Sequence, residues 1–274
     1  RIEFSLQTSS RQDAGSQGRI GQLRLRINDA LTGQPVRGLR PAAWLDATAE
    51  SGRSLAGAEC KERAGVYLRG TVGLRPLVDF NSYHLLVMNQ DASISVIDPL
   101  VGITGRTSLL ASIALKSPGF DWIRSADGTR LFVAMPKTRE LAVIDLLRFR
   151  TVQTIALPAE PSRLALQPDG RLLWVGLANG AIAYDTGNLE ISREIPLGRG
   201  HHEFAFTEDG HMLASSRADR RLDLIDTAAV KVIRSVVTPG EPVALAYSPL
   251  ARRFYASTSD NSIQVIDADK GTPT

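Results

Sequence analysis

A short β-branched segment that ends in aspartate recurs five times in this chain and sets the period that any fold must accommodate. It reads SISVID, LAVID, AIAYD, LDLID and IQVID, and the successive aspartates lie 47, 40, 41 and 41 residues apart. A turn written ADG, PDG, EDG and finally PLA keeps step with it. Two markers in phase over several intervals indicate a structural repeat. The aspartates are Asp98, Asp145, Asp185, Asp226 and Asp267.

Each repeat predicts four short antiparallel strands. In the third copy the segments SRLALQP, LLWVGLA, AIAYDT and EISREIPL are separated by the turn sequences PDG, NG and GN. Asp-Gly and Asn-Gly between alternating apolar runs are strong hairpin signals, because glycine supplies the positive φ that tight turns need. Apolar residues alternate at period two without a long 3.6-residue pattern, which excludes a helical repeat. Four strands in about 40 to 45 residues predict β-propeller blades and an all-β chain.

The repeat resembles the YVTN-type propellers, whose relatives include the haem d-binding propeller of cytochrome cd-type nitrite reductases. The pattern "VIDT...TI.L...P..LA..PDGR.L.V" carries the resemblance and covers roughly Pro76 to the C-terminus. It implies a β-propeller in which about five visible blades form part of a seven-bladed ring. It does not imply one activity, because propellers of this class serve enzymes, cofactor carriers and surface scaffolds.

The sequence divides into three parts. Residues 1–18 are rich in serine, glutamine and glycine and predict a polar tail or linker, unless they are borrowed as a strand. Residues 19–75 predict a small β-sandwich-like module, because DALTGQPVRG resembles a hairpin of exported β-sandwich domains. Extra strands packed on the propeller are the alternative. Residues 76–274 carry the YVTN-like blades.

Two departures from a regular ring set further expectations. The first interval is longer than the others, and we expect a longer loop within Pro99–Gly119. The last copy ends before its outer strand, which would leave an unpaired edge. We therefore expect a fragment of a longer propeller, or an edge completed by another segment or subunit. A five-bladed ring closed by an N-terminal strand is the alternative.

Composition narrows the partners and the compartment. The net charge is +3 with both signs interspersed, which argues against nucleic acid as the main partner. No run of about 18 apolar residues predicts a membrane span. The single cysteine, Cys60, excludes an intrachain disulfide and leaves the redox compartment open. The chain starts at Arg1, as a mature exported chain or a recombinant one would, and a periplasmic or extracellular location is expected.

Catalytic signatures are sparse in the sequence. It contains no GxSxG nucleophile elbow, nucleotide fingerprint or DxDxDG calcium loop. Cys60 precedes Lys61 and Arg63, which would favour a thiolate, but we expect a semi-buried strand cysteine. The repeated aspartates close one strand of every blade, so we expect them to cap the following turn by accepting backbone N–H groups.

The candidate site lies where the first strand of each blade begins. Alignment on the turn glycine places Asp121, Arg163 and Glu203 at one position in three successive blades, in the opposite phase to the core residues. They are therefore predicted to face a central channel and to shape a ligand pocket. His201 and His202 precede Glu203 and are predicted to lie at the rim of that channel.

A rim histidine is a candidate metal or haem ligand, because neutral imidazole binds copper, zinc and haem iron. In the haem d family, histidines that enter the central face approach the cofactor, and His201 and His202 resemble that placement. Adjacent strand residues point to opposite sides, so at most one of the pair would face the channel. A polar rim or a structural hydrogen-bonding role is the alternative.

Three hypotheses of function follow. The first is a non-enzymatic exported binding or scaffold protein, accessory to a periplasmic redox or metal system, with a protein partner or the missing propeller segment. The second is a haem- or metal-handling enzyme in which His201 or His202 acts as ligand or acid/base and Asp121, Arg163 and Glu203 form the pocket. The third is a structural subunit of a surface assembly, completed by strand exchange.

Overall fold

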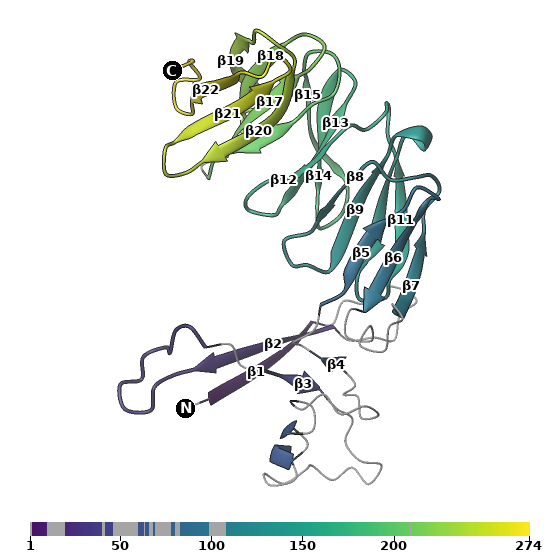
Figure 1. Cartoon of the computed structure of the whole chain (residues 1–274), viewed down its shortest axis with the longest axis vertical. Helices are drawn as coiled ribbons and strands as arrows, with labels where there is room; N and C mark the ends of the chain where they lie inside the picture. Colours follow the sequence, from purple (N-terminus) through teal and green to yellow (C-terminus); the bar gives the residue numbers. More distant parts are fainter. Residues whose placement is uncertain are drawn as a thin grey trace. The chain divides into compact units, whose positions relative to one another are not determined.

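The computed structural model describes residues 2–9, 20–39, 42–45, 60–62, 64–65, 68, 78–79, 83–98, 108–208 and 210–274. Contacts within the chain divide it into two units, Arg1–Ser82 and Tyr83–Thr274. Strands make up most of the regular structure in both units (Figure 1). In the described part of the chain, no helix has the length and hydropathy that crossing a membrane requires.

The first unit contains two strand pairs. β1 (Ile2–Ser9) pairs antiparallel with β2 (Ile20–Ile27), and β3 (Trp44–Leu45) pairs with β4 (Val78–Asp79). Residues 2–9 therefore form a strand rather than the polar tail, whereas residues 10–19 lie outside the described part. Most of the expected β-sandwich-like module also lies outside it, so that expectation stays a prediction.

The segment after β2 forms the turn that its sequence predicts. One carboxylate oxygen of Asp29 accepts the backbone N–H groups of Leu31 and Thr32, at 2.9 and 2.8 Å. Gly33 follows at φ +70°, in the left-handed region that glycine tolerates best. The chain then returns to the end of β2, where the backbone N–H of Val36 donates to the carbonyl of Ile27. A local hairpin is thus built from side-chain capping and one glycine.

The second unit is a series of antiparallel sheets in chain order, as a propeller requires (Figure 1). The first sheet comprises β5 (Leu85–Met88), β6 (Ser93–Asp98) and β7 (Ser108–Ala114). The second comprises β8 (Asp121–Arg124), β9 (Arg130–Met135), β10 (Glu140–Asp145) and β11 (Arg150–Ala156), with the 3-10 turn η2 (Pro136–Thr138) between β9 and β10.

The remaining sheets repeat this order. The third comprises β12 (Leu164–Leu166), β13 (Leu172–Leu177), β14 (Gly180–Asp185) and β15 (Ile191–Pro196). The fourth comprises β16 (Phe204–Phe206), β17 (His211–Ser216), β18 (Arg221–Asp226) and β19 (Lys231–Val237). The last comprises β20 (Pro242–Ser248), β21 (Arg253–Thr258) and β22 (Ile263–Asp267). The predicted blade of four short strands is therefore the building unit, and the fold is all-β and propeller-like.

Apolar clusters lie between neighbouring sheets, and each inner sheet contributes to two of them. In β13, Leu173 and Val175 pack toward the β8–β11 sheet, whereas Leu172 and Trp174 pack toward the β16–β19 sheet. Successive strand residues point to opposite faces, so both faces of the sheet are covered. Every residue of β13 is buried for this reason, which explains why its sequence is apolar throughout.

Four of the five repeated aspartates cap turns, as predicted, and the turn after Asp98 lies outside the described residues. One carboxylate oxygen of Asp226 accepts the backbone N–H groups of Ala228 and Ala229, at 2.8 and 2.9 Å. Equivalent pairs of hydrogen bonds are made by Asp145, Asp185 and Asp267. The hydrogen bond from Ala229 is the largest of the effects that hold the pKa of Asp226 below its usual value of 3.8. A carboxylate suits this place because it accepts both N–H groups at once.

The turn glycines also have the expected conformation. Gly128, Gly170 and Gly210 have φ of +72°, +73° and +92°, which a residue with a Cβ adopts only at a cost. In the last sheet, Ala251 stands at the position of the glycine, but the positive φ of +50° falls on Arg252. The turn therefore moves its left-handed residue by one position to accommodate the alanine.

Replacing Asp226 tests the capping role. We expect Asp226→Ala to lower the melting temperature at pH 7 by about 2–4 °C, the effect of one lost cap in a domain of this size. Because the pKa of Asp226 is lowered by folding, this stability is present above pH ~4 and is lost as pH falls through the folded pKa. Thermal unfolding at pH 7 and pH 3 measures both effects. Asp226→Asn retains an acceptor oxygen and is the control; an Ala variant as stable as the Asn variant would contradict the role.

Candidate functional site

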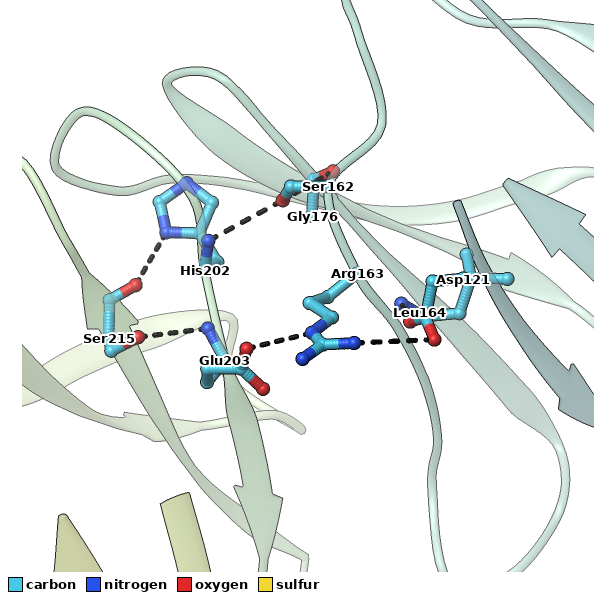
Figure 2. A network of polar contacts seen from close by, with 8 residues as sticks. All are labelled: Asp121, Ser162, Arg163, Leu164, Gly176, His202, Glu203 and Ser215. Atoms are coloured by element: carbon cyan, nitrogen blue, oxygen red, sulfur yellow. Dashed lines mark hydrogen bonds and ion pairs between the residues drawn. The ribbon is translucent and has the colours of Figure 1, made fainter. Parts of the chain in front are cut away.

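Three charged side chains meet where the first strands of neighbouring sheets begin. Asp121 opens β8, while Arg163 and Glu203 directly precede β12 and β16. The Nε of Arg163 lies 2.7 Å from Oε1 of Glu203, and its Nη1 lies 3.5 Å from Oδ1 of Asp121. Figure 2 shows these contacts as one continuous line across three sheets. We call the three residues the charge ladder.

Equivalent backbone pairing brings the ladder residues to the same level. The N–H of Gly176 donates to the carbonyl of Arg163, and the N–H of Ser215 donates to the carbonyl of Glu203. Arg163 and Glu203 are therefore held one position ahead of the first strand of their sheets, beside the second strand, while Asp121 is the first residue of β8 and lies opposite Ala134. The shared phase that the sequence predicted for Asp121, Arg163 and Glu203 is present.

The charge ladder links neighbouring sheets to one another. The second carboxylate oxygen of Asp121 accepts the backbone N–H of Leu164 in the next sheet at 2.8 Å. The hydrogen bond to Glu203 is the largest of the effects that raise the pKa of Arg163, so this guanidinium stays charged. Core residues of a first strand, such as Leu164, pack toward the preceding sheet. The residues that alternate with them therefore face the following sheet. Only Arg163 keeps much of its side chain exposed, at 42%.

The two histidines separate, one inside the protein and one outside. His202 is fully buried, and its Nδ1 lies 2.6 Å from the carbonyl oxygen of Ser215. Its backbone N–H points at the hydroxyl of Ser162 in the preceding sheet, at 3.4 Å (Figure 2). Burial is the largest effect on this ring and lowers its pKa, and the carbonyls of Ser215 and Leu177 only partly oppose it. His202 is therefore a neutral ring inside the fold at pH 7.

His201 lies at the surface and pairs with an aromatic ring that the sequence analysis did not single out. Its ring centroid is 6.0 Å from that of Phe120, with the two planes inclined by 35°. Phe120 is 54% exposed and lies directly before Asp121. The rings come from loops of the β8–β11 and β16–β19 sheets, which have the β12–β15 sheet between them in the chain. Phe120 could have been noticed in the sequence, because it is a large apolar residue directly before Asp121, where the next two blades have Ser162 and His202.

The described residues do not provide a set of metal ligands around the two histidines. His202 has a buried Nε2 that makes no hydrogen bond, as a ligand nitrogen would require. Within the described ranges, however, no three His, Cys, Asp or Glu side chains gather as metal ligands would. The expectation for Cys60 is wrong, because this residue is exposed and lies in a helical segment rather than in a strand.

Comparison with known proteins supports the fold. No family model matches the chain, and no curated protein matches its sequence. A solved structure of hydrazine synthase from Kuenenia stuttgartiensis resembles it with a TM-score of 0.50 and 17% sequence identity. The resemblance covers 68% of this chain and 74% of that one. At this identity the likeness shows a shared fold and carries no activity across.

Removing the central cation of the ladder tests what it contributes. We expect Arg163→Met to leave Asp121 and Glu203 without their shared partner and to lower the free energy of unfolding by about 0.5–1 kcal/mol, since the pair is partly screened by solvent. Urea unfolding at low and high salt measures this, and the loss should shrink as salt rises. Arg199→Met is the matched control, because the Arg199–Asp219 pair is more exposed, at 77% for the arginine. Equal losses in both variants would deny the ladder a special role.

Proposed function

We propose that this chain is a non-enzymatic binding protein, related to the YVTN-type propellers, whose ligand surface lies where the first strands begin. The observation that carries the proposal is the exposed ring pair of Phe120 and His201. The half-exposed Arg163 belongs to the same end of the sheets. We call these three residues the rim patch.

The rim patch has the composition of a recognition surface. Exposed aromatic and arginine side chains are the residues that contribute most to protein binding. A single exposed apolar residue needs no explanation, but here two rings from separate loops converge on one place. The loops start from strands that are paired on a rigid frame, which is how binding residues are commonly presented.

The chemistry of the described residues favours binding over acid-base catalysis. A general base has to be able to reach the proton that it removes, and His202 is fully buried. Glu203 and Asp121 are engaged by Arg163. His201 is exposed, but its neighbour is the hydrocarbon ring of Phe120 rather than an acid that would orient it. These groups favour a surface that recognises a partner.

Export and an accessory role in a periplasmic redox or metal system belong to the same proposal. They rest on the resemblance of the repeat to the YVTN-type propellers. A rigid stack of blades that displays a small patch suits a scaffold or carrier, because the frame keeps the loops ordered before the partner arrives.

A photo-crosslinking amino acid at position 120 tests the rim patch. We expect it to give one discrete adduct in an extract of the source organism, and excess unlabelled protein should compete the adduct away. Position 152 is the matched control, because Val152 is exposed to a similar degree, 50%, but lies within β11. The His201→Ala variant should weaken the adduct at 120 without affecting folding. The same adducts at both positions, or no adduct at 120, would overturn the proposal.

A further inference from the structure

The interface between the β12–β15 and β16–β19 sheets differs in chemistry from the two interfaces that precede it in the chain. Met135 and Leu177 occupy equivalent positions in the second strands of their sheets, because each pairs with the first residue of the following strand. Both are buried apolar residues. The equivalent residue of β17 is Ser216, fully buried with a hydroxyl that has no partner. In the third strands, Ala142 and Ile182 correspond to Asp223, which is also fully buried. Polar groups thus replace core residues on one face of the β16–β19 sheet. In the last sheet the equivalent residues, Thr258 and Gln264, are also polar.

The β12–β15 sheet has small side chains where it faces these groups. Ala181 and Ala183 lie in the apolar cluster between the two sheets. A Cβ added to Gly176 would come within 2.9 Å of the Ser162 hydroxyl and 3.1 Å of the Phe204 ring, so that backbone packs closely. We call this interface, between the β12–β15 and β16–β19 sheets, the polar seam.

His202 is the titratable ring of the polar seam. The pairing of Phe204 with Ala214 sets the register that places His202 opposite Ser216. In the neutral ring Nδ1–H donates to the carbonyl of Ser215, while Nε2 carries a lone pair and makes no hydrogen bond. A second proton would put a positive charge inside a largely apolar interface, which is costly unless an anionic partner compensates it.

The buried carboxylate of Asp223 favours a second proton on His202, but burial of the ring has the larger effect on its pKa and lowers it. Asp223 is fully buried, but Arg221 pairs with it at 3.0 Å and the hydroxyl of Ser235 donates to it. His201 is the next residue in the chain and opposes a second positive charge. From the β12–β15 sheet, the hydroxyl of Ser162 accepts the backbone N–H of His202, and the backbone of Leu177 raises the pKa of the ring; both groups are uncharged.

We infer that the polar seam opens in mild acid, with His202 as the group that takes up the proton. The inference goes beyond the proposed function, because it concerns the frame rather than the ligand. Opening would also separate His201 and Glu203 from Phe120 and Arg163, which belong to the preceding sheets. The rim patch would therefore come apart under the same conditions.

The direction of the pH effect follows from the buried ring. Folding lowers the pKa of His202 from 6.5, chiefly through burial, whereas the ring in the opened seam titrates normally. The opened state therefore binds the extra proton, and the seam has its full stability above about pH 6.5. Below that pH the opening constant should rise by up to about tenfold per pH unit until the folded pKa is reached.

Trp174 reports on the seam directly. It is fully buried and belongs to the cluster between the two sheets. In the full chain carrying Trp44→Phe and Trp122→Phe, it is the single tryptophan. We expect acrylamide quenching of its fluorescence to increase as the pH falls from 7.5 to 5.5. His202→Gln should abolish the increase, since its amide can still donate to Ser215 but does not titrate.

Two controls distinguish protonation of His202 from a loosening of the whole protein in acid. His201→Gln removes the exposed neighbour and should leave the pH response intact. If His202→Gln fails to fold, an NMR titration of the wild-type ring takes its place, and its transition should coincide with the quenching transition. Quenching that does not change with pH, or that changes equally in His202→Gln, would overturn the inference. Neither readout uses a ligand, so failure of the proposed function would leave this result standing.

Discussion

The packing of each sheet face against the next sheet is the constraint on which the rest of the second unit depends. Both faces of an inner sheet have to be apolar, as the fully buried β13 illustrates. Most polar groups are then left to the strand ends and the turns, where the aspartate caps and the charge ladder lie, and the buried Asp223 of β18 is an exception. The same packing explains the unusual turns after the third strands. Phe149, Leu189 and Val230 adopt positive φ, which is strained for residues with a Cβ, and each packs its side chain against a cluster between sheets.

The features that the sequence predicted correctly are local ones. Strand alternation, turn glycines and the capping role of residues such as Asp226 depend on neighbours within a few positions, and the repeat shows them several times. The common phase of Asp121, Arg163 and Glu203 was predictable for the same reason. The channel that they were predicted to face stays a prediction, while the contacts of these side chains are with neighbouring sheets. Phase alone cannot distinguish a side chain that faces a channel from one that reaches across to a neighbouring sheet.

The histidine pair shows a different limit. Nothing in the letters HH distinguishes a residue that will be fully buried from one that will lie at the surface, because both precede the strand and both are polar. The polar contacts of the buried His202 are with Ser162 and Ser215, which are 40 and 13 positions away in the sequence and become neighbours only in the folded protein. Asp223 was the missed signal. It interrupts the apolar run of LDLID in the middle of a strand, at a position where the two preceding copies of the repeat have Ala142 and Ile182.

The polar seam carries two kinds of polar contact, and they respond to different conditions. At its exposed end the ladder joins Arg163 to Glu203 across the two sheets, and a pair of this kind weakens with salt. Within the interface His202 is shielded from solvent, so salt reaches it poorly, but a proton changes its charge outright. Salt bridges between carboxylates and guanidinium groups persist through mild acid. Between pH 7 and pH 5.5 the Arg163–Glu203 pair therefore opposes the separation of the two sheets, while protonation of the buried ring favours it. Salt and acid together should open the seam more readily than either alone, because each removes one of the two contacts.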